Sequence, residues 1–141
     1  MPTSNDHELS ESGATDDLRG LEILLVEDSP VVADALKQHL ELLGARVIGP
    51  AATTAEAKKL IAQSLPHVAL IDFHLRGENS YQLIAQARDL GIPVIMLSGS
   101  LEFPVPISLE GIALLEKPAS EAQILEHLRP IVEKRRGQHL A

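Results

Sequence analysis

The sequence predicts an α/β domain in which a parallel sheet is covered by helices on both faces. Three observations point to this class. Short apolar runs alternate with segments of helical periodicity about five times along the chain. Apolar residues make up 45% of the chain and aromatic residues only 2%, so the core must be built from aliphatic side chains, which suits a helix-covered sheet. The length of 141 residues indicates a single domain.

The predicted strands and helices follow one another along the chain. Five apolar runs are predicted to be strands: residues 21–26, 46–48, 68–71, 94–97 and 113–115. Four helices are predicted: from Pro30 to Gly44, over 54–65, over about 80–90, and from Ser120 through Val132. This order implies parallel strands, because each helical connection returns the chain across one face of the sheet.

Capping residues define where the helices begin. Ser29 stands directly before Pro30, the favoured pairing of an N-cap with a proline at the first helical position. Thr53 is followed three residues later by Glu56, and Ser120 by Gln123. Both spacings are capping boxes, in which each side chain bonds to the other residue's backbone N–H group.

Prolines indicate two places where helical structure is expected to fail. A helix is expected within residues 99–112, but Pro104 and Pro106 forbid a regular one, so this fourth helix should be irregular or shortened. Pro130 lies well inside the last predicted helix and is expected to kink or split it.

Composition separates a folded domain from two tails. Residues 1–20 carry five acidic side chains against one basic side chain and have few large apolar residues, which predicts a disordered acidic tail over residues 1–19. Residues 20–136 form the predicted domain, and residues 137–141 form a second short tail.

Charge and apolar content exclude several classes of function. The net charge of −8 argues against direct nucleic-acid binding. The chain has no cysteine, which excludes disulfides, thiol nucleophiles and thiolate metal sites. No apolar run approaches the ~20 residues of a membrane span, and the N-terminus lacks a signal-peptide pattern. A cytoplasmic location without membrane contact is therefore expected.

Polar side chains follow four of the predicted strands directly. Glu27 and Asp28 come after the first strand, Asp72 after the third, Ser98 after the fourth and Lys117 after the fifth. The carboxyl ends of parallel strands meet at one edge of the sheet, which is where open α/β sheets bind their ligands. Three carboxylates, one hydroxyl and one ammonium group are therefore predicted to converge.

This set of groups suits magnesium and a phosphoryl group. Three adjacent carboxylates repel one another, and a divalent cation with oxygen ligands relieves that repulsion. Asp72 stands alone at the central strand and is the predicted nucleophile, which would form an acyl phosphate. Lys117 would balance charge on the phosphoryl oxygens and Ser98 would donate a hydrogen bond to one of them. Glu27 and Asp28 are adjacent and suit metal and water binding.

Four motifs carry a resemblance to a known family. LLVEDSP, LIDFHL, IMLSGS and LLEKPAS resemble the acidic-pair loop, phosphoacceptor strand, hydroxyl strand and Lys-Pro loop of response-regulator receiver domains. The resemblance covers roughly residues 21–136. It implies a flavodoxin-like, doubly wound sheet of five strands in the order 2-1-3-4-5, the fold type for which the chemotaxis receiver is a standard example.

The resemblance also implies residue roles and partners. Asp72 would accept phosphate from a histidine kinase or phosphotransfer protein, and a downstream protein target would read the result. Magnesium would be held by Asp28, Asp72 and the backbone carbonyl of His74, with Glu27 acting largely through water. From its position two residues after Asp72, two interpretations of the His74 side chain stay open: an exposed loop residue, or a group that modulates attack by water on the acyl phosphate.

A narrower resemblance concerns the segment DFHLRGENSYQL. It looks like the pattern of an alphaproteobacterial receiver subgroup, matching at Gly77, Glu78 and Tyr81, whereas residues 96–100 keep only the hydroxyl and the glycine of the subgroup's Phe-Ala-Thr-Gly-Tyr stretch. Leu114 replaces the aromatic residue that swings inward in most receivers. We therefore expect residues 99–112 to be mobile and to become ordered on phosphorylation or partner binding.

Three functions remain open from the sequence alone. The first is a phosphoacceptor that signals by protein contact or serves as a phosphate shuttle or sink, and that catalyses only its own phosphotransfer and dephosphorylation. The second is an enzyme of the haloacid-dehalogenase type, which usually has a second aspartate where His74 stands here. The third is a receiver-fold interaction module that works without phosphorylation. A homodimer is possible through the last strand and helix, with Leu101, Phe103 and Val105 as exposed apolar residues.

Overall fold

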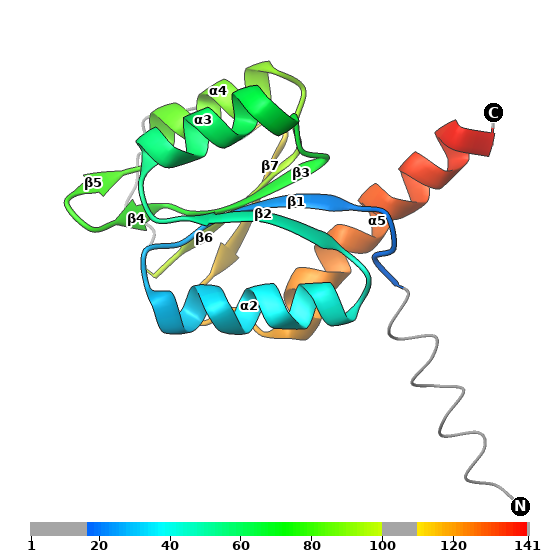
Figure 1. Ribbon diagram of the computed structural model, residues 1–141, viewed down its shortest axis with the longest axis horizontal. Helices are drawn as coiled ribbons and strands as arrows, with labels where there is room; N and C mark the ends of the chain where they lie inside the picture. Colours follow the sequence, from blue (N-terminus) through cyan, green and yellow to red (C-terminus); the bar gives the residue numbers. More distant parts are fainter. Residues whose placement is uncertain (1–16, 100–109, 141) are drawn as a thin grey trace, which may run out of the picture.

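The fold is a five-stranded parallel sheet between two layers of helices (Figure 1). The computed structural model describes residues 17–99 and 110–140. The sheet has the order β2-β1-β3-β6-β7. Its strands are β1 (Glu22–Val26), β2 (Arg46–Ala51), β3 (Val68–Asp72), β6 (Val94–Ser98) and β7 (Ile112–Glu116). Counted along the chain, this is the predicted order 2-1-3-4-5, and the predicted fold class is confirmed.

Each face of the sheet buries its own aliphatic core. Helices α2 (Pro30–Leu42) and α5 (Glu121–Leu140) cover one face, and α3 (Thr54–Ser64) and α4 (Tyr81–Asp89) cover the other (Figure 1). Alternate residues of β1 enter different cores: Ile23 and Leu25 face α2 and α5, whereas Leu24 and Val26 face α3 and α4. All of β3 and β6 is buried, so the carboxyl ends of these strands are held rigidly.

The predicted caps are present. Ser29 Oγ accepts a hydrogen bond from the Val32 N–H group at 3.4 Å. At α3, Thr53 Oγ1 accepts from the Glu56 N–H group at 3.2 Å, and Glu56 Oε1 accepts from the Ala52 N–H group at 3.1 Å. At α5, Ser120 and Gln123 bond to each other's backbone N–H groups at 3.1 and 2.8 Å.

A short hairpin not predicted from the sequence follows the third strand of the chain. It consists of β4 (His74–Leu75) and β5 (Glu78–Asn79), paired antiparallel, and it extends beyond the edge of the main sheet (Figure 1). Gly77 in its turn has a φ of 79°, a backbone conformation that favours glycine. The strands are too short for periodicity to indicate them.

Helix α5 runs from Glu121 to Leu140, so Pro130 does not split it, and a kink at this proline stays a prediction. Pro130 removes only one backbone donor, and it lies on the exposed side of the helix. Leu128 and Val132 flank it and are both buried in the core, so they hold the two halves of the helix against the sheet.

Ordered structure extends past both predicted domain boundaries. Leu18, assigned to the acidic tail, is fully buried, and its N–H group donates to the Leu43 carbonyl at 2.8 Å. Helix α5 continues through residues 137–140, which the sequence assigned to a tail. The predictions for residues 1–16 and 100–109, which include most of the tail, the irregular fourth helix and the apolar dimer surface, lie outside the described residues. Of the helices that are described, none has both the length and the apolar character needed to cross a membrane.

Candidate functional site

The three predicted carboxylates meet at the carboxyl edge of the sheet. Oxygens of Glu27, Asp28 and Asp72 all lie within 4.8 Å of one another. Strands β1 and β3 pair directly, with Val26 opposite Ile71, and this register brings the residues that follow β1 beside the end of β3. Glu27 and Asp72 are each only 3% exposed, so two of the three charges lie in the protein interior.

Lys117 supplies a cation to this group. Its Nζ lies 3.0 Å from Asp72 Oδ2 and 3.4 Å from Glu27 Oε1. The lysine follows β7, and its N–H group donates to the Ser98 carbonyl at 2.7 Å. Ser98 is the last residue of β6 and is buried beside this edge. All five residues predicted to follow the strand ends are therefore brought to one edge of the sheet.

The protonation equilibria of the site reflect its charge imbalance. Burial raises the pKa of Glu27, and the nearby Asp72 charge adds to the rise, although the Ser29 N–H group and the Lys117 ammonium oppose it. Burial on its own would lower the pKa of Lys117, but its hydrogen bond and charge interaction with Asp72, together with Glu27, raise that pKa overall. The negative groups thus outweigh the single ammonium group among them.

The donor set fits a divalent cation with a preference for oxygen. Three carboxylates converge without sulfur or imidazole side chains among them, which is the ligand chemistry of magnesium rather than of zinc or copper. A net charge of −2 remains after Lys117 is counted against the three acids, and a divalent ion would compensate it.

His74 contributes its backbone to the site. Its N–H group donates to Asp72 Oδ1 at 3.2 Å, which orients the predicted nucleophile. Its imidazole is exposed and lies edge-on to the Phe73 ring, with the ring centroids 4.9 Å apart. The role of the His74 carbonyl as a metal ligand stays a prediction, as does a kinetic role for the side chain.

Three further contacts at the site were missed from the sequence. The Arg76 N–H group donates to Asp28 Oδ2 at 2.6 Å. The fully buried Ser80 hydroxyl lies 2.8 Å from the Asp72 carbonyl and 3.2 Å from the Phe73 carbonyl, either of which can accept its proton. The position of Ser80 directly before a helical segment was a detectable N-cap signal, although here its hydroxyl bonds to carbonyls at the end of β3 instead of capping the helix.

The third missed contact joins the hairpin to a helix. Both oxygens of Glu78 accept hydrogen bonds from Thr54, at 3.1 Å from its N–H group and 2.9 Å from its hydroxyl. Thr54 is the first residue of α3. Because these residues are 24 positions apart and belong to different elements, no local sequence pattern indicates their contact.

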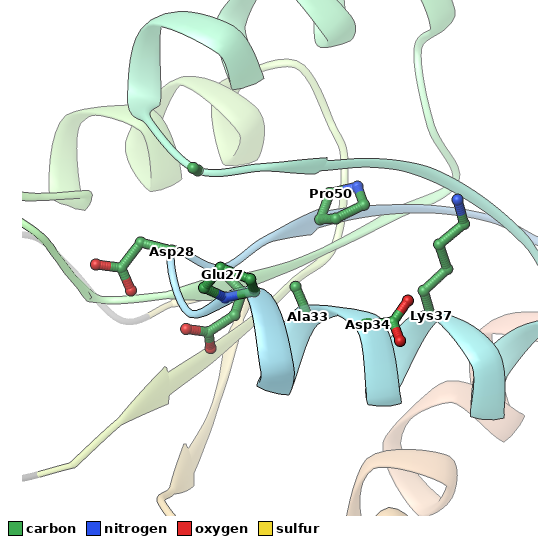
Figure 2. Close-up of a pocket in the computed structure, with 8 residues that line it drawn as sticks. Glu27, Asp28, Ala33, Asp34, Lys37 and Pro50 are labelled. Carbon is green, nitrogen blue, oxygen red and sulfur yellow. The ribbon is translucent and has the colours of Figure 1, made fainter.

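A pocket of about 320 Å³ opens beside the acidic pair, between α2 and the end of β2 (Figure 2). In Figure 2, Asp34 and Lys37 lie along α2, away from Glu27 and Asp28. The residues that line the pocket are Glu27, Asp28, Pro30, Ala33, Asp34, Lys37, Pro50 and Ala52. The acidic pair therefore has open space on its α2 side.

Leu114 stands where the resemblance described above predicts an aromatic residue. It lies in the middle of β7, opposite Met96 of β6, and is only partly buried against the core that α3 and α4 cover. Its side chain thus takes part in aliphatic packing.

Comparison with known sequences gives a family match over most of the chain. Residues 23–129 match the response regulator receiver domain family. The C4-dicarboxylate transport transcriptional regulatory protein DctD of Pseudomonas aeruginosa is 31% identical over 82% of this chain and 26% of its own length. The uncharacterized transcriptional regulatory protein YbdJ of Bacillus subtilis is 32% identical over 85% of this chain and 54% of its own length. This chain thus spans about a quarter to a half of those two relatives.

Solved structures share the fold. A CheY-like receiver domain protein from Methanospirillum hungatei has a TM-score of 0.74 and 28% identity, covering 84% of this chain and 98% of its own. The response regulator PhyR from Brucella abortus has a TM-score of 0.71 and 22% identity, covering 97% of this chain and 58% of its own. At that identity, the likeness to PhyR concerns the fold alone.

Proposed function

This chain belongs to the family of response regulator receiver domains, and from that premise we propose that it is a phosphoacceptor of a two-component system, with Asp72 as the residue phosphorylated. Receiver domains interact with histidine kinases or phosphotransfer proteins and bind Mg²⁺ at an acidic pocket. The observation that carries the proposal is the meeting of a buried Asp72 with the acidic pair and with Lys117, whose Nζ is 3.0 Å from the Asp72 carboxylate.

The proposed reaction is transfer of a phosphoryl group to a carboxylate. An oxygen of Asp72 attacks phosphorus, the new P–O bond forms, and the P–N bond of the donor phosphohistidine breaks so that the imidazole leaves. The His74 N–H group, 3.2 Å from Asp72 Oδ1, orients the attacking carboxylate. Lys117 exchanges its bond with Asp72 for one with a phosphoryl oxygen, and Ser98 donates a hydrogen bond to another.

Glu27, Asp28, Asp72 and the His74 carbonyl would hold the magnesium ion. When bound, the ion neutralises charge that would otherwise repel the phosphoryl group from the three acids. The Lys117 ammonium supplements it, because its raised pKa keeps it protonated at neutral pH.

A protein is the favoured phosphodonor. The start of α2 presents an apolar surface beside the acidic pair, where Val31 is 80% exposed and Val32 is 38% exposed. Contiguous exposed apolar residues mark protein interaction sites, and these two valines are adjacent in the chain. In this proposal the chain works in the cytoplasm, catalyses only its own phosphotransfer and dephosphorylation, and delivers its output by protein contact or as a phosphate shuttle or sink.

Magnesium-dependent labelling with acetyl phosphate tests the proposal. Wild-type protein should gain one phosphoryl group in a magnesium-dependent manner, detected by intact mass, and Asp72→Asn should gain none. Asp89→Asn is the matched control, because this carboxylate lies at the end of α4 with 72% of its side chain exposed. Unlabelled wild-type protein would favour the phosphorylation-independent module, and turnover of small phosphate esters would favour the haloacid-dehalogenase type of enzyme.

A further inference from the structure

The β4–β5 hairpin touches the acidic site through its backbone. The His74 N–H group donates to Asp72, and the Arg76 N–H group donates to Asp28 Oδ2 at 2.6 Å. His74 begins β4 and Arg76 lies in the turn directly after that strand, so the strand and the turn of the hairpin each donate one N–H group to the acids. The orientation of the Asp28 carboxylate therefore depends on where the hairpin lies.

Glu78 anchors the far side of the same hairpin. Its two carboxylate oxygens accept hydrogen bonds from the N–H group and the hydroxyl of Thr54, at 3.1 and 2.9 Å. Core packing holds Leu75, which is buried, but the residues of the turn and of β5 are exposed. Glu78 thus fixes this exposed part of the hairpin to α3.

Glu78 also satisfies a free N–H group at the start of α3, but its contact with Thr54 does more than cap the helix. The capping box of α3 satisfies other groups, since Thr53 Oγ1 accepts from the Glu56 N–H group and Glu56 Oε1 accepts from the Ala52 N–H group. Glu78 comes from a different element, 24 residues further along the chain. It lies only two residues from Arg76, so loss of its anchor would move the N–H group that orients Asp28.

We propose that Glu78 is a positioning residue for the metal site: by anchoring the hairpin to Thr54, it holds the Arg76 N–H group against Asp28 and so keeps that carboxylate oriented for Mg²⁺. This inference rests on the proposed metal-dependent function. Residues that orient metal ligands typically change metal affinity by about 10- to 100-fold when altered. We expect an effect near the lower end of that range, because Glu78 acts through the backbone of two intervening residues.

The test compares two carboxylates that accept hydrogen bonds at the start of α3: Glu78, which comes from the hairpin, and Glu56, which belongs to the helix itself. The Mg²⁺ dissociation constant is measured by calorimetric titration for wild type, Glu78→Ala, Glu78→Gln and Glu56→Ala. Glu78→Ala should bind Mg²⁺ about tenfold more weakly. Glu78→Gln, which retains one acceptor oxygen, should fall between Glu78→Ala and wild type. Glu56→Ala should bind as wild type does, since Glu56 caps α3 without touching the hairpin.

A second readout follows the anchor without the metal. In magnesium-free protein, amide hydrogen exchange at Arg76 should be faster in Glu78→Ala than in wild type and unchanged in Glu56→Ala. In addition, Thr54→Ala should weaken Mg²⁺ binding less when Glu78 has already been removed, because both variants break the same contact.

The outcomes separate the inference from the function on which it rests. Wild-type Mg²⁺ binding with an unchanged dissociation constant in Glu78→Ala would overturn the positioning role alone. An equal loss of affinity in Glu56→Ala and Glu78→Ala would also overturn it, because general destabilisation of α3 would then explain both. A wild-type protein that binds no Mg²⁺ would overturn the proposed function together with the inference.

Discussion

At the carboxyl edge of the sheet, the chemistry of each charged side chain depends on the charges of its neighbours. Glu27 and Asp72 are buried close to each other, and the ammonium group of Lys117 forms an ion pair with each of them. The lysine has opposite effects on two steps of the proposed chemistry. It competes with a metal ion for the carboxylates, but it also stabilises the phosphoryl oxygens once transfer begins.

Replacing Lys117 should therefore separate metal binding from phosphotransfer. Lys117→Met should bind Mg²⁺ more tightly, by at least about fivefold, because repulsion between unit charges about 4 Å apart is worth about 1 kcal/mol even at the dielectric constant of water. Its rate of phosphorylation should fall sharply. Titration with Mg²⁺ and acetyl phosphate labelling measure the two effects, and Lys37→Met is a control, since Lys37 lies further along α2. Weaker Mg²⁺ binding in Lys117→Met would contradict the charge argument.

His67 lies at the opposite edge of the sheet and makes folding sensitive to acid. Its Nδ1 accepts a hydrogen bond from the Glu22 N–H group at 2.9 Å, which requires the ring nitrogen to be unprotonated. Burial lowers the pKa of His67, and the Arg135 charge lowers it further, although the Glu22 carboxylate opposes both.

Folding should accordingly weaken as the pH falls through the histidine range. Below the ordinary pKa of about 6.5, the unfolded chain binds a proton at His67 that the folded chain resists, so the free energy of unfolding decreases. His67→Asn keeps an acceptor atom but has no titratable ring, and it should remove this part of the pH dependence. Urea unfolding from pH 7.5 down to pH 5.5 measures the slope in both proteins. Identical slopes would show that His67 is not the group responsible.

At the scale of elements, local sequence signals predict some features and fail for others. The capping boxes of α3 and α5 were found because they involve residues three positions apart. The β4–β5 hairpin was missed because its strands are two residues long and its anchors, Thr54 and Asp28, are distant in sequence. The continuity of α5 through Pro130 likewise depends on core contacts of flanking residues, which no local proline rule contains.

Strand β2 contains a backbone position that only glycine fits well. Its register with β1 shifts between Leu24 and Val26, and Gly49 lies in this irregular stretch with a φ of 101°. A Cβ atom at Gly49 would lie 2.8 Å from the Ala51 nitrogen and 2.9 Å from the Leu25 carbonyl oxygen, both of them backbone atoms that cannot easily move.

Gly49→Ala should therefore destabilise the domain by about 3 kcal/mol, since strained backbone alone costs about 1–3 kcal/mol and the close contacts add to it. Gly91→Ala is the control, because Gly91 has a φ of 81° but no atom within 4 Å of the added Cβ. That variant should lose only about 1 kcal/mol. Urea denaturation gives both values. Equal losses in the two variants would mean that φ strain, rather than crowding, determines the effect.

For the whole molecule, topology explains why the site residues were easier to predict than the contacts between elements that hold them in place. Parallel strands bring their carboxyl ends to one edge, so Glu27, Asp28, Asp72, Ser98 and Lys117 could be grouped from their positions after the strands. The same reasoning gives no information about residues such as Leu18, which precedes β1 and is buried through contacts with distant elements. Side-chain pairs that join separate elements, such as Glu78 with Thr54, follow from three-dimensional packing alone.

The converging carboxylates also make the stability of the whole domain depend on magnesium. In the metal-free protein, Asp28 is repelled by Glu27 and Asp72, and no ion pair between Asp28 and Lys117 is found in the described residues. A ligand that binds only the folded state raises the free energy of unfolding by about 2.7 kcal/mol at a concentration 100 times its dissociation constant. Wild-type stability should therefore rise steadily as magnesium is added.

Asp28→Asn should raise the stability of the metal-free protein and remove most of its dependence on magnesium. The amide removes one repelling charge and keeps an oxygen that can accept the Arg76 N–H group, so the metal-free variant should be more stable than wild type, by about 1 kcal/mol. It should gain little on addition of magnesium, so the two stability curves should cross as the concentration rises. Urea unfolding across a magnesium series at constant ionic strength measures this, with Asp89→Asn expected to follow wild type. Parallel curves for wild type and Asp28→Asn would mean that magnesium acts elsewhere, whereas a crossing would mean that the acids needed for phosphotransfer destabilise the fold until the metal binds.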